Sequence, residues 1–146
     1  MKKQGLLGTV FLALAVILSL AGIVIYWINT HGGYYSDFAP EIVVCGAAGI
    51  AVLIVLKVLA VKIGEKQWMD FLYILAAVLL SWTAVSFLGD RVESAAIILG
   101  SNLEAGNTLA KQSLFTAFAG VGCFVLGMIL TGVSGFFTQQ KEKQNP

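Results

Sequence analysis

The chain has 146 residues, of which 58% are hydrophobic and only 12% charged, and its mean hydropathy is +0.88. A soluble domain carries roughly 25% charged residues, so this chain has too few charges to cover a water-exposed surface. The composition excludes a disordered chain, a nucleic-acid-binding module and an ordinary cytosolic enzyme, and the formal net charge of +1 indicates no polyanionic partner. It is the composition of an integral membrane protein, whose first partner is membrane lipid.

Four apolar stretches are long enough to cross a bilayer, whose core of about 30 Å takes about 20 residues of helix. The sequence predicts spans at about residues 6–28, 42–63, 69–89 and 114–137. Helices are expected because lipid offers no hydrogen-bond partner to an exposed backbone. The predicted fold is an all-α, antiparallel four-helix bundle that forms a single membrane domain over residues 1–146.

The first span has a second interpretation, as a signal peptide. Lys2 and Lys3 form a basic start, and Ser19-Leu20-Ala21 has the spacing of a cleavage site. The apolar run continues to Ile28, however, whereas a cleavable core is usually 7–15 residues long. We therefore expect the segment to remain as a membrane helix.

The distribution of basic residues predicts the orientation. With both termini in the cytoplasm, loop 64–68 and tail 138–146 lie on that side, and loops 29–41 and 90–112 lie outside. Lysines then gather inside, as the positive-inside rule requires, and we expect Lys57 to extend its side chain to the cytoplasmic interface. The predicted location is a bacterial plasma membrane. The inner set is Lys2, Lys3, Lys57, Lys62, Lys66, Lys141 and Lys143, and the outer set is Arg91 and Lys111.

Small residues predict where the helices meet, because close backbone approach is what holds helices together in lipid. The strongest pattern is a four-residue repeat in the fourth span, which either packs inside the bundle or joins two copies into a homo-oligomer. The predicted packing positions are Gly8 and Gly22 in the first span, Gly49 in the second, and Ala119, Cys123, Gly127 and Gly135 in the fourth.

The first outer loop contains the chain's single histidine beside aromatic and acidic residues. The nearest His/carboxylate grouping is His31, Asp37 and Glu41, which is too small a set for a metal or acid–base site. A solvated loop is the simpler interpretation. The alternative is a surface that contacts a ligand or partner through His31, Tyr34, Tyr35 and Asp37.

The second outer segment, residues 90–112, alternates apolar and polar residues at helical spacing. It predicts a short extracytoplasmic amphipathic helix that caps the bundle, with a break near Gly100 or Gly106. Asp90 and Arg91 are expected to anchor the end of the third helix at the membrane interface. These two residues, with Glu93 and Glu104, are further candidate contacts for a partner. Whether the segment is a plug, a gate or a docking surface stays open.

Chemical motifs point away from catalysis. The chain has no P-loop, dinucleotide fingerprint, nucleophile elbow or metal-binding motif, and no carboxylate lies deep in a predicted span. We therefore expect no catalytic residues, metal or cofactor, and an accessory or scaffolding subunit of a membrane complex. The alternative is an oligomeric channel or small-solute permease with a path lined by Ser81, Thr83, Ser86, Thr116 and Thr131.

Two stretches carry a resemblance to a known group. Residues 26–40 have an Asn-x-x-Gly-Gly-Tyr-Tyr-x-x-Phe-Ala-Pro character, and residues 91–98 followed by 107–112 add to it. In these stretches the chain resembles a group of small four-span bacterial membrane proteins for which no activity is established. The resemblance implies an accessory role near carbohydrate uptake or breakdown, beside another membrane or extracytoplasmic protein, and transfers no functional residue.

Overall fold

The computed structural model describes residues 2–137 and is all-helical, as the composition predicts. The expected cytoplasmic tail 138–146 lies outside the described residues. Each of the four long helices is long and apolar enough to cross a membrane, so the chain has the build of a multi-pass membrane protein. The elements are α1 (Lys2–His31), α2 (Pro40–Ile63), the short 3-10 helix η1 (Gln67–Met69), α3 (Asp70–Gly100) and α4 (Thr108–Gly135).

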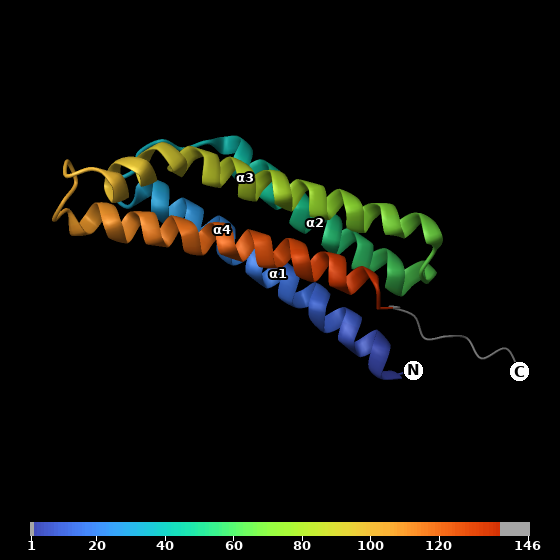
Figure 1. Cartoon of the computed structure of the whole chain (residues 1–146). Coiled ribbons are helices and arrows are strands. Elements are labelled where there is room, and N and C mark those ends of the chain that lie inside the picture. Colours follow the sequence, from blue (N-terminus) through green and yellow to red (C-terminus); the bar gives the residue numbers. More distant parts are fainter. Residues whose placement is uncertain (1, 138–146) are drawn as a thin grey trace, which may run out of the picture.

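The four helices lie side by side, and consecutive helices run in opposite directions (Figure 1). α1 packs against α4 and α2, and α3 packs against the same two helices, so every helix has two neighbours in a ring. The start of α1 and the end of α4 lie at one end of the bundle, here called the terminal end, together with the α2–α3 connection. Loops 32–39 and 101–107 lie at the opposite end, here called the Arg91 end.

Local sequence signals explain where the helices begin and end. Pro40 occupies the first turn of α2, where its missing N–H costs nothing. The side chain of Asn107 caps α4 by accepting a hydrogen bond from the backbone N–H of Ala110 at 3.1 Å. Gly64 after α2 and Gly106 before α4 have φ angles of 76° and 92°, which favour glycine.

The structure corrects the prediction for residues 90–112. No separate helix lies between α3 and α4. Instead, α3 continues to Gly100, a turn covers residues 101–107, and α4 begins at Thr108. The break does fall at the two predicted glycines. Both helices extend beyond the apolar runs because Ile98 of α3 packs with Ala110 and Leu114 of α4. This small buried cluster stabilises the last turns of α3 and the first turns of α4.

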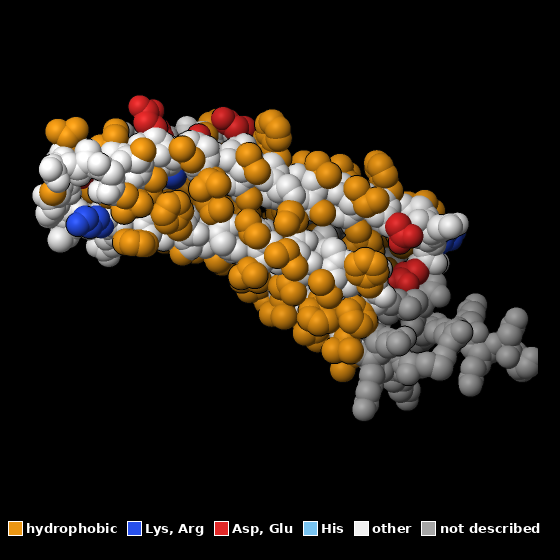
Figure 2. Space-filling model, viewed as in Figure 1, with side chains coloured by type: hydrophobic (Ala, Val, Ile, Leu, Met, Phe, Trp, Pro, Cys, Tyr) orange, Lys and Arg blue, Asp and Glu red, His pale blue; other side chains and the backbone are white. Residues whose placement is uncertain are grey.

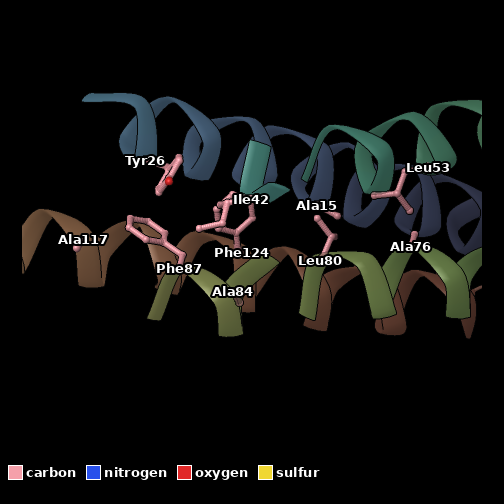
Figure 3. Packing of buried hydrophobic residues seen from close by; sticks show 10 residues of the cluster. All are labelled: Ala15, Tyr26, Ile42, Leu53, Ala76, Leu80, Ala84, Phe87, Ala117 and Phe124. Atoms are coloured by element: carbon pink, nitrogen blue, oxygen red, sulfur yellow. The ribbon is translucent and has the colours of Figure 1, made fainter. Parts of the chain in front are cut away.

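The core of the bundle combines a few large rings with many alanines. Tyr26, Phe87 and Phe124 are completely buried and lie among small side chains from neighbouring helices (Figure 3). Large hydrophobic side chains instead cover much of the outside of the molecule (Figure 2). Trp82, for example, is 62% exposed although it lies in the middle of α3. A surface of this kind fits lipid, because lipid tails are as apolar as the side chains that they contact.

Glycines permit the closest helix contacts. A Cβ on Gly127 of α4 would lie 2.6 Å from the Oγ of Ser19 and 3.3 Å from the carbonyl oxygen of Ala15, both on α1. A Cβ on Gly22 would lie 2.9 Å from the Phe124 ring, and one on Gly49 would lie 3.1 Å from Leu80. α1 and α4 therefore approach each other at Gly22 and Gly127, and α2 approaches α3 at Gly49, more closely than a larger residue would allow.

Only part of the predicted four-residue repeat of α4 lies in the contact strip, where Gly127 is buried against α1. Ala119 is exposed and Cys123 is half-buried, whereas Gly120, one residue further along, is buried against Phe87 and Ile25. A 3.6-residue helix rotates away from a strict four-residue repeat, so the buried strip changes register along the helix. Of the remaining predicted positions, Gly8 is buried on α1, while Gly135 is exposed near the Tyr73 ring.

A single lysine links α1 to α2 within the apolar part of the bundle. The Nζ of Lys57 donates a hydrogen bond of 2.6 Å to the Oγ1 of Thr9. The Thr9 hydroxyl in turn donates to the carbonyl oxygen of Gly5. The Lys57 ammonium group thus has a hydroxyl partner on α1. That its side chain also extends to the cytoplasmic interface stays a prediction.

We expect Gly127→Ala to destabilise the bundle and Gly122→Ala to leave it unchanged or slightly stabilised. The added methyl group at position 127 meets Ser19 and the α1 backbone, and overpacking of this kind costs about 1–3 kcal/mol. At position 122 the methyl group has open space, so only the gain in helix propensity remains. Thermal unfolding in detergent checks this pair, and equal midpoints would contradict it.

Candidate functional site around Arg91

The side chain of Arg91 is the largest fully buried side chain among the described residues, with an exposed fraction of 1%. A buried guanidinium is costly unless its charge and its N–H groups find partners. The expectation that Arg91 anchors α3 at the interface is therefore corrected. Because α3 continues to Gly100 and loop 32–39 folds over this level of the bundle, Arg91 lies inside the protein instead.

The guanidinium joins α1, loop 32–39 and α3. Its Nε donates to the Oδ1 of Asn29 at 3.1 Å. Its Nη1 forms an ion pair with the Oδ2 of Asp37 at 2.8 Å and also donates to the carbonyl oxygen of Asp90 at 3.3 Å. Planar Arg suits this role, because its N–H groups point in several fixed directions at once.

Aromatic rings enclose the same group. The guanidinium carbon lies 4.0 Å from the centre of the Tyr35 ring and 5.9 Å from that of Phe87. A cation over an aromatic face is stabilised by the ring quadrupole, and most strongly where water is excluded. Phe87 continues the contact to α1 by meeting the Tyr26 ring edge-on at 4.8 Å.

Two polar side chains of α1 extend the network to the rest of this end. The Nδ2 of Asn29 donates to the carbonyl oxygen of Ser113 on α4 at 2.7 Å. The hydroxyl of Tyr26 accepts from the backbone N–H of Ala39 at 2.7 Å and lies 3.4 Å from the carbonyl oxygen of the same residue. All four helices or their loops are thus connected within one group of contacts. We call it the Arg91 cluster, comprising Tyr26, Asn29, Tyr35, Asp37, Phe87, Arg91 and Ser113.

Charge is distributed unevenly across the cluster. Arg91 is buried, whereas 61% of the Asp37 side chain is exposed to the surroundings. Burial raises the pKa of the Tyr35 phenol, which also lies near Ser94, and the positive charge of Arg91 opposes this rise. Tyr35 therefore stays a neutral ring beneath the cation over the physiological pH range.

Outside the cluster, three side chains form an exposed patch that we call the aromatic rim: Trp27, His31 and Phe38. The rings of Trp27 and His31 stack with centres 4.4 Å apart, and Phe38 meets Trp27 edge-on at 5.5 Å. Trp27 is 52% exposed and Phe38 is 40% exposed. The rim is therefore ordered by ring contacts but remains available to other molecules.

A hollow of about 170 Å³ lies beside the cluster, between the end of α1 and the start of α4. Asn29 and Ser113 line it, so the cluster forms part of its wall. Gln112 and Thr116 add further polar groups, while Ile28 and Leu109 add apolar ones. The hollow is large enough for a side chain or a few water molecules.

The predicted contact residues divide into three groups. Tyr35, Asp37, Asp90 and Arg91 come together in or next to the cluster, and Tyr34 packs beside them with its ring 4.9 Å from Tyr35. His31 belongs to the aromatic rim. Glu93 is exposed on α3, apart from the cluster, whereas Glu104 in loop 101–107 accepts a hydrogen bond from Asn107 and lies near the phenol of Tyr34.

Sequence reasoning did not find Tyr26, Asn29, Phe87 or Ser113. Tyr26, near the end of the first apolar run, is completely buried. One sequence signal could have indicated Asn29: it directly follows the first apolar run, on the same predicted side of the membrane as Arg91. Within residues 2–137, no group of three or more His, Cys, Asp or Glu residues could hold a metal ion. Cys45 and Cys123 are free thiols.

No protein-family model matches the chain, and searches of curated proteins and of solved structures found no match either. The resemblance to a group of small bacterial four-span proteins stays a prediction.

We expect Arg91→Lys to destabilise the protein more than Asp37→Asn. Lysine keeps the charge but loses the Nε–Asn29 bond and the flat stacking on Tyr35, and a hydrogen bond to a charged group contributes about 1.5–3 kcal/mol. Asp37 is mostly exposed, so water compensates part of its loss. Detergent unfolding midpoints check the order. Lys111→Arg, on an exposed basic residue of the same end, is the control; a larger loss for Asp37→Asn would contradict the expectation.

Proposed function

We propose that this protein is a non-enzymatic accessory or scaffolding subunit of a bacterial cell-membrane complex, which presents its Arg91 end to a partner protein. One observation carries the proposal: the Arg91 cluster holds loop 32–39 against the bundle while the aromatic rim outside it stays exposed.

Such an arrangement suits protein recognition for two physical reasons. A loop that is already ordered loses little conformational entropy on binding, so more of the contact energy contributes to affinity. Tryptophan is also enriched among the residues that dominate binding energy, and Trp27 is half-exposed at the centre of the rim. The hollow beside the Arg91 cluster, between α1 and α4, offers a place for a partner side chain.

The proposed orientation places both termini in the cytoplasm and the Arg91 end outside. The lysine distribution supports it, since the connection between α2 and α3 and the two ends of the chain carry most of the basic residues. The partner is then another membrane protein or an extracytoplasmic protein. The resemblance described above suggests carbohydrate uptake or breakdown as its context. Association with a second copy is the other arrangement to test.

The orientation predicts a labelling pattern. In a background with Cys45→Ala and Cys123→Ala, a membrane-impermeant maleimide added to intact cells should modify Asn102→Cys in loop 101–107. Gln67→Cys, in the connection at the terminal end, should react only after the cells are opened. Both positions are exposed, so access across the membrane decides the result. The reverse pattern would invert the topology.

Partner binding should depend on the aromatic rim. We expect Trp27→Ala to reduce recovery of a cross-linked partner from native membranes by about tenfold or more, as loss of a hot-spot residue costs roughly 2 kcal/mol or more. Trp82→Ala removes a somewhat more exposed tryptophan in the middle of α3 and should have no effect. If Trp82→Ala reduced recovery of the partner and Trp27→Ala did not, the interface would lie along the middle of α3 and not at the aromatic rim.

The channel or permease hypothesis has less support. Its proposed path uses hydroxyl groups that bond to carbonyl oxygens of their own helices, as Thr83 does to Leu79 and Thr131 does to Gly127. Ser81 and Thr116 behave in the same way. Solute flux into proteoliposomes above that of empty vesicles would favour a channel over the scaffold.

A further inference from the structure

A second cavity lies at the terminal end of the bundle, opposite the Arg91 cluster. Its volume is about 300 Å³, the lower limit of the roughly 300–1,000 Å³ common for ligand sites. The end of α2, the connection to α3, the first turn of α3 and the last residues of α4 all contribute to its lining. Since three helices meet there, the cavity belongs to the bundle and not to one flexible loop.

The position of this cavity corresponds to the headgroup level of a membrane. The membrane-spanning helices that surround it end or begin at Ile63, Gln67 and Gly135. On either face of a bilayer, lipid headgroups are the most concentrated small polar groups at this depth. Nearby Trp68 and Phe136 are 50% and 90% exposed, and aromatic side chains of this kind favour the interface.

The lining has an apolar part and a charged part. Leu56 and Ala60 of α2 form the apolar part, which is the part of the cavity nearest the interior of the bundle. Glu65 and Asp70 bring two carboxylates to the other part, and Lys66 brings one ammonium group. Figure 2 shows acidic side chains next to hydrophobic ones at this end of the molecule. A molecule that fits this lining needs a cationic group, an anionic group and an apolar continuation.

We propose that this cavity binds the headgroup of a phospholipid that carries a primary amine, of the phosphoethanolamine type. The ammonium group lies between Glu65 and Asp70, the phosphate lies toward Lys66, and the glycerol and first acyl carbons lie along Leu56 and Ala60. This inference goes beyond the proposed scaffold function and does not depend on which face of the membrane the terminal end occupies.

Hydrogen bonding explains why a primary amine is preferred. An ammonium group has three N–H donors, which two carboxylates and water can accept. The quaternary amine of a choline headgroup has the same charge but no donor, so it leaves the carboxylates without hydrogen bonds. A glycerol headgroup lacks the cation, and its phosphate is repelled by the carboxylates. Charge-assisted hydrogen bonds are the stronger kind, so selectivity is expected.

The test uses the full-length protein reconstituted in equal amounts of dioleoyl phosphatidylethanolamine, phosphatidylcholine and phosphatidylglycerol. After extraction into gentle detergent, native mass spectrometry counts the lipids that stay bound. We expect the ethanolamine lipid to be retained at least about threefold over each of the others, the effect of part of one charge-assisted hydrogen bond. Equal retention of the ethanolamine and choline lipids would overturn the proposal without need of any variant.

Variants locate the site. Glu65→Gln and Asp70→Asn should remove most of the preference, whereas Glu93→Gln, an exposed acidic residue near the Arg91 end, should not change it. Unfolding midpoints measured in phosphatidylcholine alone show that each variant is folded. A preference that survives both Glu65→Gln and Asp70→Asn would place the lipid elsewhere and overturn the assignment.

Two further experiments test whether the effect comes from the lysines of the tail, or whether the cavity binds a soluble amine and not a lipid. Replacing Lys141 and Lys143 with Gln should leave the preference unchanged; its loss would assign the recognition to the tail and overturn the proposal. Millimolar soluble phosphoethanolamine should not displace the bound lipid, because it lacks the apolar part that Leu56 and Ala60 contact. Displacement by the soluble compound would show that the headgroup alone is recognised, without the apolar contacts to Leu56 and Ala60, and would overturn the assignment to a lipid.

Discussion

The burial of one guanidinium group imposes the strongest constraint on this structure. Arg91 lies inside the bundle, where an unpaired charge would be too costly, so several parts of the chain have to meet it. Asn29 comes from α1, Asp37 and Tyr35 come from loop 32–39, and their contacts reach α4 through Ser113. The contacts that compensate this charge thus connect loop 32–39 and three helices at this end of the bundle.

Elsewhere the bundle is held by shape. Helices in lipid gain little from hydrophobicity against each other, so they associate where their backbones approach closely. Gly127 lets α4 approach Ser19 and Ala15 of α1, and Gly49 makes room for Leu80 of α3. The large side chains that such contacts displace are turned outward, which produces the apolar exterior seen in Figure 2. A soluble protein with this exterior would aggregate, whereas in a membrane the same surface is solvated by lipid.

The two ends of the bundle differ in a way that suits different tasks. At the Arg91 end, polar contacts close the structure and leave ordered aromatic side chains outside, which favours contact with another protein. At the terminal end, Glu65 and Asp70 line a cavity beside exposed aromatic residues, which favours a small amphiphilic ligand. Under the two proposals above, the protein would contact a lipid headgroup at one end and a partner protein at the other, with a bundle of close-packed helices between them.

Composition and periodicity were sufficient to predict an all-helical chain with four apolar helices, because the need to satisfy every backbone polar group in lipid leaves few other solutions. The glycines at positions 100 and 106 likewise indicated where α3 and α4 separate. Local patterns did not reveal that residues 90–100 prolong α3, since that depends on Ile98 finding Ala110 and Leu114 across the turn. They also suggested an interfacial role for Arg91, because a basic residue after an apolar run commonly has one. Only the tertiary structure determined that Arg91 is buried. The partners that compensate its charge and hydrogen bonds, Asn29 and Asp37, lie more than 50 positions away in the chain, beyond the reach of a local pattern.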